Sequence, residues 1–332
     1  MAYAPATPLT AGEIPVIDIA GLRERDPEAL ARVARGLHAA ASEQGFFYVA
    51  GHGVPQPLID DAFAMARRFF AAPLDDKQRV AIDRNHRGFL RIGEATMHGG
   101  ARPDLKESYI FGREVAPDDP DYLAGHPMVS PNNWPDFVPG MRETLMRYFS
   151  AVHACGESLL RAFAAGVGVR DDYFVQRIDK PVSRGSLVYY PPQPAAAGEQ
   201  QFGVAPHTDF GTLTLVYQDD VGGLQIRGRD GQWKTAAPIA GTFVVNVGDL
   251  LHRWSNDRFV STPHRVVNAS SRERFSIAVF VDPNCDTVIE PVCVDGEPAR
   301  YPAVRCADYI TGRFDNAFGY RATPQRPPAE AE

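Results

Sequence analysis

The decisive stretch of the chain reads Pro206-His-Thr-Asp-Phe210, and a third candidate ligand, His264, follows on a later β-type run. Side chains of a β-strand alternate between its two faces, so His207 and Asp209 point the same way if residues 206–210 are extended. His264 then reaches the same place from a separate strand. Three such ligands leave the opposite side of a metal open, which is typical of mononuclear Fe(II) sites. Zinc hydrolases use similar ligand sets, so these residues alone leave both metals open.

A candidate seat for a carboxylate follows the third histidine. Arg274 and Ser276 are two residues apart, so they share one face of the strand expected over Arg274–Val281. The guanidinium offers two parallel, charge-assisted hydrogen bonds, and the hydroxyl adds a third donor. Tyr190, which ends the run Ser186–Tyr190, is expected to add a phenol donor. The sequence therefore predicts a metal site beside an anchor for an acidic cosubstrate.

From Ser186 onward, apolar residues recur with a period of two, which is typical of β-strands. Asp230-Gly231 is typical of a tight hairpin, and neither a Gly-x-Gly-x-x-Gly motif nor a phosphate loop is present. The spacing favours a double-stranded β-helix, or jelly roll, over a parallel α/β sheet, within a mixed α/β (α+β) fold. The β-rich runs are 186–190, 212–217, 223–227, 232–236, 242–247, 264–268 and 275–281.

The N-terminal half combines predicted helices with short strands. A strand over Ile14–Ile19 precedes a helix that opens with Asp26 as N-cap and Pro27 as its first residue. Apolar spacing then predicts a strand at 46–50, a helix at 57–72 and a long helix over Met141–Val167 that backs the sheet, while residues 83–104 read as a long loop.

Three segments are expected. Residues 1–140 form a helical and mixed region that packs on the core and contributes to the substrate pocket, and residues 141–318 form the catalytic core with its backing helix. Residues 319–332, rich in proline and in alternating alanine and glutamate, are expected to be a disordered tail.

Composition excludes several classes of partner. The chain has 332 residues, 44% of them hydrophobic and 23% charged, and its formal charge of −7 gives no footprint for nucleic acid or anionic membranes. A small-molecule substrate is expected instead. The four cysteines have no metal-type spacing and are predicted to be free thiols. The sequence shows neither a signal peptide nor a bilayer-spanning stretch, so a cytoplasmic location is expected.

The glycine-rich loop expected over residues 83–104 is the candidate recognition element, because loops on a rigid scaffold often bind ligands. The segment from Gln193 to Phe202 is a candidate lid. The residues expected to line the substrate pocket are His86, Arg87, Phe89, Arg91, Met97 and His98 in the loop, and Tyr109 and Phe111 on the strand that follows.

The sequence resembles the isopenicillin N synthase-like branch of the 2-oxoglutarate/Fe(II)-dependent dioxygenases over nearly its whole length. In the N-terminal half, the matching motifs are Ile14-Pro-Val-Ile-Asp18, Gly45-Phe-Phe-Tyr-Val-Ala-Gly-His-Gly-Val54 and Asp104-Leu-Lys-Glu107. In the C-terminal half they are Tyr189-Tyr-Pro-Pro192, His207-Thr-Asp209, Gly222-Gly-Leu-Gln225, Val247-Gly-Asp249, Trp254-Ser-Asn-Asp257, Ser261-Thr-Pro-His-Arg-Val266 and Arg274-Phe-Ser276.

The resemblance implies an Fe(II)- and 2-oxoglutarate-dependent oxygenase with a jelly-roll core. Iron is then held by His207, Asp209 and His264, and the far carboxylate of 2-oxoglutarate meets Arg274 and Ser276, with Tyr190 nearby. Such enzymes consume O2, release succinate and CO2, and oxidise a small to medium-sized organic molecule, most often by hydroxylation, through a ferryl species.

Three alternatives remain at this point. Some members of the same family, such as isopenicillin N synthase itself, carry an Arg-x-Ser pair without consuming 2-oxoglutarate. A non-catalytic jelly roll that only binds a ligand is disfavoured, because a carboxylate facing two imidazoles in a dry pocket is costly without a cation. A zinc hydrolase lacks support, since no separate general base is found in the sequence.

Overall fold

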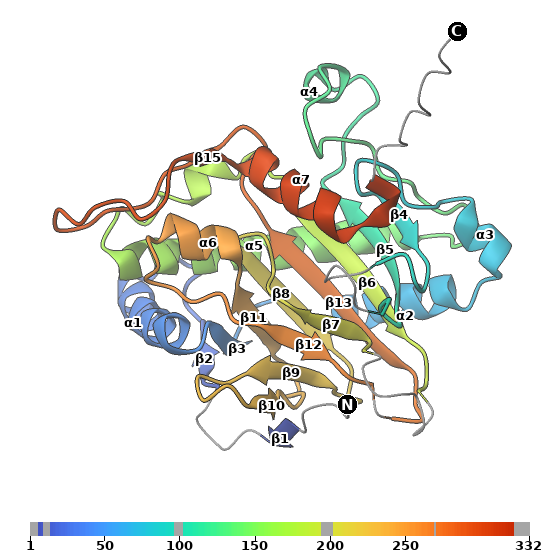
Figure 1. Cartoon of the computed structure of the whole chain (residues 1–332), viewed down its shortest axis with the longest axis horizontal. Helices are drawn as coiled ribbons and strands as arrows, with labels where there is room; N and C mark the ends of the chain where they lie inside the picture. Colours follow the sequence, from blue (N-terminus) through green and yellow to red (C-terminus); the bar gives the residue numbers. More distant parts are fainter. Residues whose placement is uncertain (1–5, 9–13, 96–101, 194–201, 269, 322–332) are drawn as a thin grey trace, which may run out of the picture.

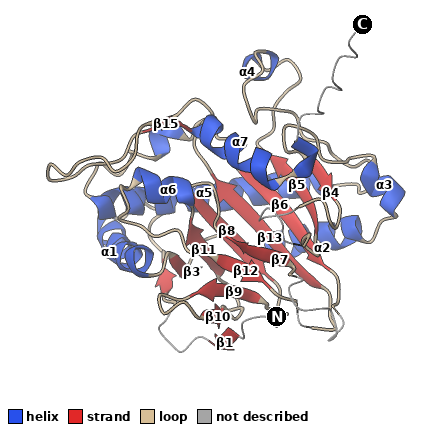
Figure 2. Cartoon of the chain, viewed as in Figure 1, coloured by secondary structure: helices blue, strands red, loops and turns tan. Residues whose placement is uncertain are grey.

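The computed structural model describes residues 6–8, 14–95, 102–193, 202–268 and 270–321. It has a mixed α/β architecture in which helices lie around two central sheets except at the edge formed by β9, β10 and β1 (Figure 1, Figure 2). The predicted mixed α/β class is therefore confirmed. No helix of the described ranges combines the length and the apolar character needed to cross a membrane.

The larger sheet draws its strands from both halves of the chain. Its centre is β13, which pairs antiparallel with β6 on one side and with β8 on the other. The strand order is β2 (Val16–Asp18), β3 (Phe46–Ala50), β11 (Phe243–Val247), β8 (Leu213–Gln218), β13 (Arg274–Val281), β6 (Arg184–Tyr190), β5 (Glu107–Gly112) and β4 (Gly88–Leu90).

The smaller sheet contains the two strands that carry the histidine pair. β12 pairs antiparallel with β7, and the register sets His264 opposite His207. The order is β1 (Ala6–Pro8), β10 (Trp233–Thr235), β9 (Leu224–Arg227), β12 (His264–Val266) and β7 (Val204–His207), and a separate two-stranded ribbon joins β14 (Val288–Ile289) to β15 (Val304–Arg305).

Three long helices, α1, α2 and α5, cover one face of the larger sheet. α5 packs on β13 and β8, and α1 and α2 pack in turn on α5. The side chain of Asp26 caps α1 by accepting from the backbone N–H of Glu28, as predicted. The helices are α1 (Pro27–Glu43), α2 (Gln56–Phe70), α3 (Leu74–Gln78), α4 (Pro120–Leu123), α5 (Met141–Val167), α6 (Asp249–Trp254) and α7 (Cys306–Ala317), with short 3-10 turns η1 (Val175–Arg177) and η2 (Gly319–Arg321).

Strand alternation gives the larger sheet two different faces. On β13, Phe275, Ile277, Val279 and Val281 belong to the core shared with the helices. The alternate residues of β13, from Arg274 to Phe280, line a pocket on the opposite face, toward the smaller sheet. The functional side chains therefore lie between the two sheets.

Several predicted elements differ from the structure. The expected loop at 83–104 contains β4, which pairs with β5 and buries the apolar side chains of Phe89 and Leu90. The expected tail at 319–332 is wrong for residues 319–321, which form η2, while residues 322–332 lie outside the described ranges. The four cysteines are free thiols, as predicted.

Candidate metal centre and adjoining pockets

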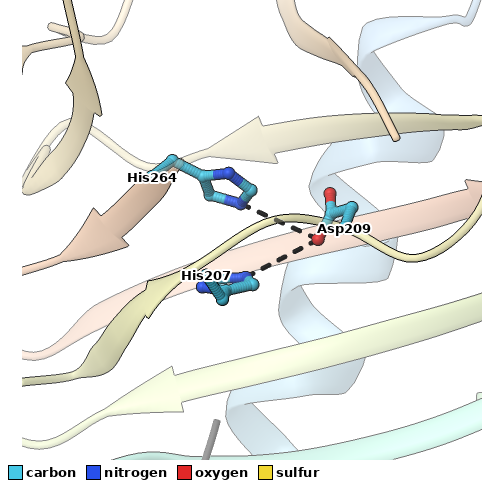
Figure 3. Close-up of side chains that lie close together, drawn as sticks. All are labelled: His207, Asp209 and His264. Carbon is cyan, nitrogen blue, oxygen red and sulfur yellow. Dashed lines mark ion pairs between the residues drawn. The ribbon is translucent and has the colours of Figure 1, made fainter. Parts of the chain in front are cut away.

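Three side chains from two strands and a turn converge between the sheets (Figure 3). The Nε2 atoms of His207 and His264 lie 3.6 and 3.7 Å from Oδ1 of Asp209. All three ligand atoms lie within 4.8 Å of one another. This spacing fits one metal ion bound by two imidazoles and one carboxylate.

Asp209 reaches this position from a turn and not from a strand. β7 ends at His207, so the expected extension of the strand to residue 210 is wrong. The turn is held by a hydrogen bond from the backbone N–H of Asp249 to the carbonyl of Asp209, 2.7 Å long. Glycine is required at position 211 in this turn, because a Cβ at this residue would collide with the carboxylate of Asp282.

Hydrogen bonds orient each ligand toward the common point. Nδ1 of His207 donates to the carbonyl of Ala205 at 2.8 Å, and Nδ1 of His264 donates to that of Thr262 at 3.2 Å, so both Nε2 atoms present a lone pair. The second oxygen of Asp209 accepts from the Thr214 hydroxyl at 2.5 Å and from the Asn246 amide at 2.7 Å. Oδ1 is thereby left for a metal.

The protonation states suit a cation. Burial opposes ionisation of Asp209, but the neighbouring imidazoles and hydrogen bonds outweigh it and lower the pKa of this carboxyl. Burial, reinforced by the adjacent His207, lowers the pKa of His264 to about 4. At neutral pH the site therefore offers an anionic oxygen and a neutral imidazole nitrogen, which are the forms that bind metal.

The carboxylate seat lies in the same cavity. Arg274 is 1% exposed, its guanidinium stands 4.5 Å from the ring centroid of Tyr190, and its Nη1 lies 3.3 Å from the Ser276 hydroxyl. Its other hydrogen bonds go to the carbonyl of Gly222 and the amide oxygen of Gln218. None of the described residues places a carboxylate within ion-pair distance of this guanidinium. A buried cation with neutral partners fits an anionic ligand that comes from outside the chain.

Two pockets meet at the metal ligands. One runs from Arg274, Ser276 and Tyr190 to the three ligands, with Phe46, Asn246 and Phe280 among its walls. The other opens on the far side, and Lys106, Ser186, His207, Asp209 and Phe280 line both. The second is lined by His86, Leu90, Lys106, Ser108, Ile110, Arg184, Ser186, His207, Thr208, Asp209, Phe210, Phe280, Phe314 and Phe318.

The prediction for β5 and β4 selects the wrong face. Tyr109 and Phe111 are fully buried in the main core, and Ser108 and Ile110 line the pocket instead. Phe89 likewise packs into the core. Its ring lies 5.9 Å from that of Phe69, and its neighbour Leu90 faces the pocket.

The loop residues separate into three groups. Arg87 is buried, but it donates to the backbone carbonyls of residues 85, 86 and 128, and so stabilises the loop from outside the pocket. Arg91 is exposed and pairs with Glu94. Neither lines the pocket. Among the loop candidates, His86 does, whereas Met97, His98 and most of the expected lid, residues 194–201, lie outside the described ranges.

Several pocket residues are absent from the sequence prediction. Phe314 lies on α7 and Phe318 directly follows it, more than 100 positions after His207, and no local pattern marks either residue. Arg184 has a signal in the sequence: Arg184-Gly-Ser186 repeats the Arg-x-Ser pattern of Arg274-Phe-Ser276.

Known protein families and relatives match both halves of the chain. Residues 14–137 match a family described as the N-terminal region of non-haem dioxygenases in morphine synthesis, and residues 183–283 match the 2OG-Fe(II) oxygenase superfamily. The 2-oxoglutarate-Fe(II) type oxidoreductase hxnY of Emericella nidulans is 35% identical over 317 residues, which cover 92% of this chain and 90% of that protein.

Solved structures of similar proteins superpose on most of the chain. T7H of Neurospora crassa, in complex with alpha-KG and thymine, superposes with a TM-score of 0.81 at 30% identity and covers 92% of this chain and 98% of its own. JOX2, in complex with 2OG, Fe and JA, superposes with a TM-score of 0.75 at 29% identity, over 92% of this chain and 85% of its own.

Proposed function

The chain belongs to the 2OG-Fe(II) oxygenase superfamily and is a non-haem Fe(II)- and 2-oxoglutarate-dependent dioxygenase. We propose that it oxidises a small or medium-sized organic molecule that binds beside His207 and Asp209. The observation that carries the proposal is the pair of pockets that meet at the metal ligands. One offers a buried cation for the cosubstrate, and the other is free for a substrate. When bound, iron and 2-oxoglutarate supply the oxidising power, with O2 consumed and succinate and CO2 released.

Each residue has a distinct role in this proposal. His207, Asp209 and His264 hold the iron from one side, while Thr214 and Asn246 orient the carboxylate. Three residues around the seat bind the far carboxylate of 2-oxoglutarate, because a guanidinium fork and two hydroxyls can all donate to it; they are Arg274, Ser276 and Tyr190.

The proposed architecture is a double-stranded β-helix in which the two sheets enclose the site. Residues 141–318 carry the iron and cosubstrate ligands, and residues 1–140 complete the substrate pocket through β4, β5 and the turn at His86. The related structures with thymine and with JA support a small-molecule substrate.

The direct test is succinate release. Apoprotein supplied with Fe(II), ascorbate and 2-oxoglutarate in air is expected to release succinate, slowly without substrate and faster with the correct one. His207→Ala is expected to reduce release to the level seen without protein, because the metal loses one of three ligands. The wild-type protein releasing no succinate with any candidate metabolite would contradict the proposed function.

The cosubstrate seat has its own test. Arg274→Met is expected to weaken 2-oxoglutarate binding by about thirtyfold or more, since removing one partner of a buried charge pair costs about 2–5 kcal/mol. The matched control is Arg272→Met, whose guanidinium forms an exposed ion pair with Asp220. Equal 2-oxoglutarate dissociation constants for the two variants, measured by calorimetry without O2, would place the cosubstrate elsewhere.

A further inference from the structure

Two neighbouring strands carry the same pattern in opposite directions. β6 reads Arg184-Gly-Ser-Leu-Val-Tyr-Tyr190, and β13 reads Arg274-Phe-Ser-Ile-Ala-Val-Phe280. They pair antiparallel, with Arg274 opposite Tyr190 and Arg184 opposite Phe280. Each guanidinium lies over the aromatic ring of the opposite strand, 4.5 Å from Tyr190 and 5.2 Å from Phe280. The strand pair therefore has an Arg-x-Ser seat at each end.

The second seat has a donor without a partner. Arg184 is 3% exposed, and its Nη2 donates to Oδ2 of Asp282 at 3.0 Å. Asp282 is fixed in turn, because its Oδ1 accepts from the backbone N–H of Thr212 at 3.1 Å. Nη1 of Arg184 is buried and has no hydrogen-bond partner. An unsatisfied buried donor is costly, and Arg184 lines the pocket, so an acceptor is expected to reach the donor from the pocket when a ligand binds.

The two cations on this pocket wall, Arg184 and Lys106, already have carboxylate partners. The charge of Arg184 is compensated by Asp282, unlike that of Arg274, which has no carboxylate partner among the described residues. Lys106, the other cation on the wall, has Asp104 at 3.8 Å. A carboxylate arriving here would add an uncompensated negative charge to a buried site, whereas a neutral oxygen would satisfy the donor at no such cost.

Aromatic rings form a large part of the remaining wall, together with Leu90 and Ile110. The rings of His86 and Phe314 stack with centroids 4.3 Å apart and planes inclined by 23°, and Phe210, Phe280 and Phe318 complete the lining. Burial, with a contribution from Arg184, lowers the pKa of His86 well below its ordinary value, so its ring is neutral. Such walls pack best against another planar ring.

We infer that the substrate is a small planar ring that bears a neutral carbonyl oxygen, and that Nη1 of Arg184 receives this oxygen. The ring lies among the aromatic walls, and the pocket extends from Arg184 to His207 and Asp209, where the bound iron would act. This inference rests on the proposed function. It assigns Arg184 as the residue that selects the substrate, with Asp282 as the residue that positions it.

The test compares isosteric probes on the protein loaded with Fe(II) and 2-oxoglutarate in the absence of O2. Benzamide carries a ring and a neutral carbonyl, benzoate replaces the amide by a carboxylate, and acetamide lacks the ring. Calorimetry is expected to show benzamide binding at least about tenfold more tightly than either of the others, because benzoate adds a charge, acetamide lacks the ring, and only benzamide combines the ring with a neutral acceptor.

The variant Arg184→Met/Asp282→Asn removes both partners of the ion pair, which avoids leaving a buried charge alone. It is expected to lower benzamide affinity about tenfold to a hundredfold. Arg170→Met/Asp172→Asn, which removes a surface pair, is the matched control and is expected to leave benzamide affinity unchanged. If the double variant fails to fold, Arg184→Lys takes its place in the test. This variant keeps a cation for Asp282 but lacks the second arm of the guanidinium, so it is expected to show the same loss of benzamide affinity.

Three results would overturn the inference: no saturable benzamide binding at millimolar concentration, tighter binding of benzoate, or equal benzamide affinity in the Arg184 variants and the control. Each leaves the proposed function standing if the wild-type protein still releases succinate from 2-oxoglutarate. Absence of that release is the separate failure of the proposed function.

Discussion

Asp209 uses its two carboxylate oxygens for different purposes. Oδ1 faces the imidazoles, while Oδ2 accepts from Thr214 and Asn246. A carboxylate that is free to rotate would offer either oxygen or both, so the two donors select a single-oxygen geometry. Mutation of residues that hydrogen-bond to a metal ligand commonly changes the metal affinity tenfold to a hundredfold.

Asn246→Ala is therefore expected to weaken Fe(II) binding by about ten- to a hundredfold without removing any ligand. The measurement is the dissociation constant of Fe(II), or of Mn(II) as a redox-inert substitute, by anaerobic calorimetry. Asn284→Ala is the control, because the Asn284 amide donates to Asp179 at the surface. An unchanged metal affinity for Asn246→Ala would show that Thr214 alone orients the carboxylate.

At the scale of elements, the long helices are specified by local signals. Asp26 caps α1, Pro27 begins it, and its apolar stripe packs on α5. α5 begins at Met141 and ends at Val167, as its sequence pattern predicts. These helices form the rigid backing of β13 and β8, and so fix the sheet whose opposite face carries the site.

Removing the cap of α1 is expected to cost about 1 kcal/mol of unfolding free energy in Asp26→Ala, because the N–H of Glu28 loses its acceptor. Asp26→Asn keeps an acceptor oxygen and is expected to cost much less. Urea denaturation of both variants provides the measurement. Equal losses would show that the charge of Asp26, interacting with the helix dipole, matters more than the hydrogen bond.

At the scale of the whole molecule, the pocket depends on contacts between distant segments. The turn at His86 meets α7 through the stacked ring of Phe314 and hydrogen-bonds to the hydroxyl of Tyr320. β2 to β5 from the N-terminal half complete the sheet formed by the C-terminal half. The pocket lined by these residues therefore exists only when the turn at His86 and α7 are both folded onto the core.

His86 makes this contact sensitive to acid. Burial, then Arg184 and the other nearby cations Arg87, Arg321 and Lys106, lower its pKa well below 6.5 in the folded protein. Below pH 6.5 the unfolded chain therefore binds a proton that the folded protein does not. Stability attributable to His86 is full above that pH and is lost as pH falls, by up to about 1.4 kcal/mol per pH unit.

His86→Asn is expected to flatten the decline of unfolding free energy between pH 6.5 and pH 5, measured by urea denaturation at a series of pH values. Asparagine is chosen because the residue has a φ of 62°, which asparagine tolerates better than most residues. The difference in unfolding free energy between the two proteins at pH 8 gives the contribution of the packing that the variant loses. Parallel curves for wild type and variant would show that His86 does not control the acid response.

The sequence alone determined the parts of this protein that depend on local periodicity and spacing. The three long helices α1, α2 and α5 and most of the β-rich runs could be identified without coordinates, because capping at a helix start and alternation along a strand act within a few residues. The family and the residues His207, Asp209, His264, Arg274 and Ser276 could be identified from the order and spacing of short motifs. The structure brings these five side chains into one cavity.

Only the tertiary structure decided which residues line the pocket beside the metal ligands. Alternation shows that Ser108 and Tyr109 lie on opposite faces of β5, but which face meets the helices depends on the layers packed above and below. Phe314 arrives from α7 through long-range packing, and the free donor of Arg184 emerges only when Asp282 is known to occupy the other arm. Such relations arise from contacts between segments far apart in the chain, which no local pattern encodes.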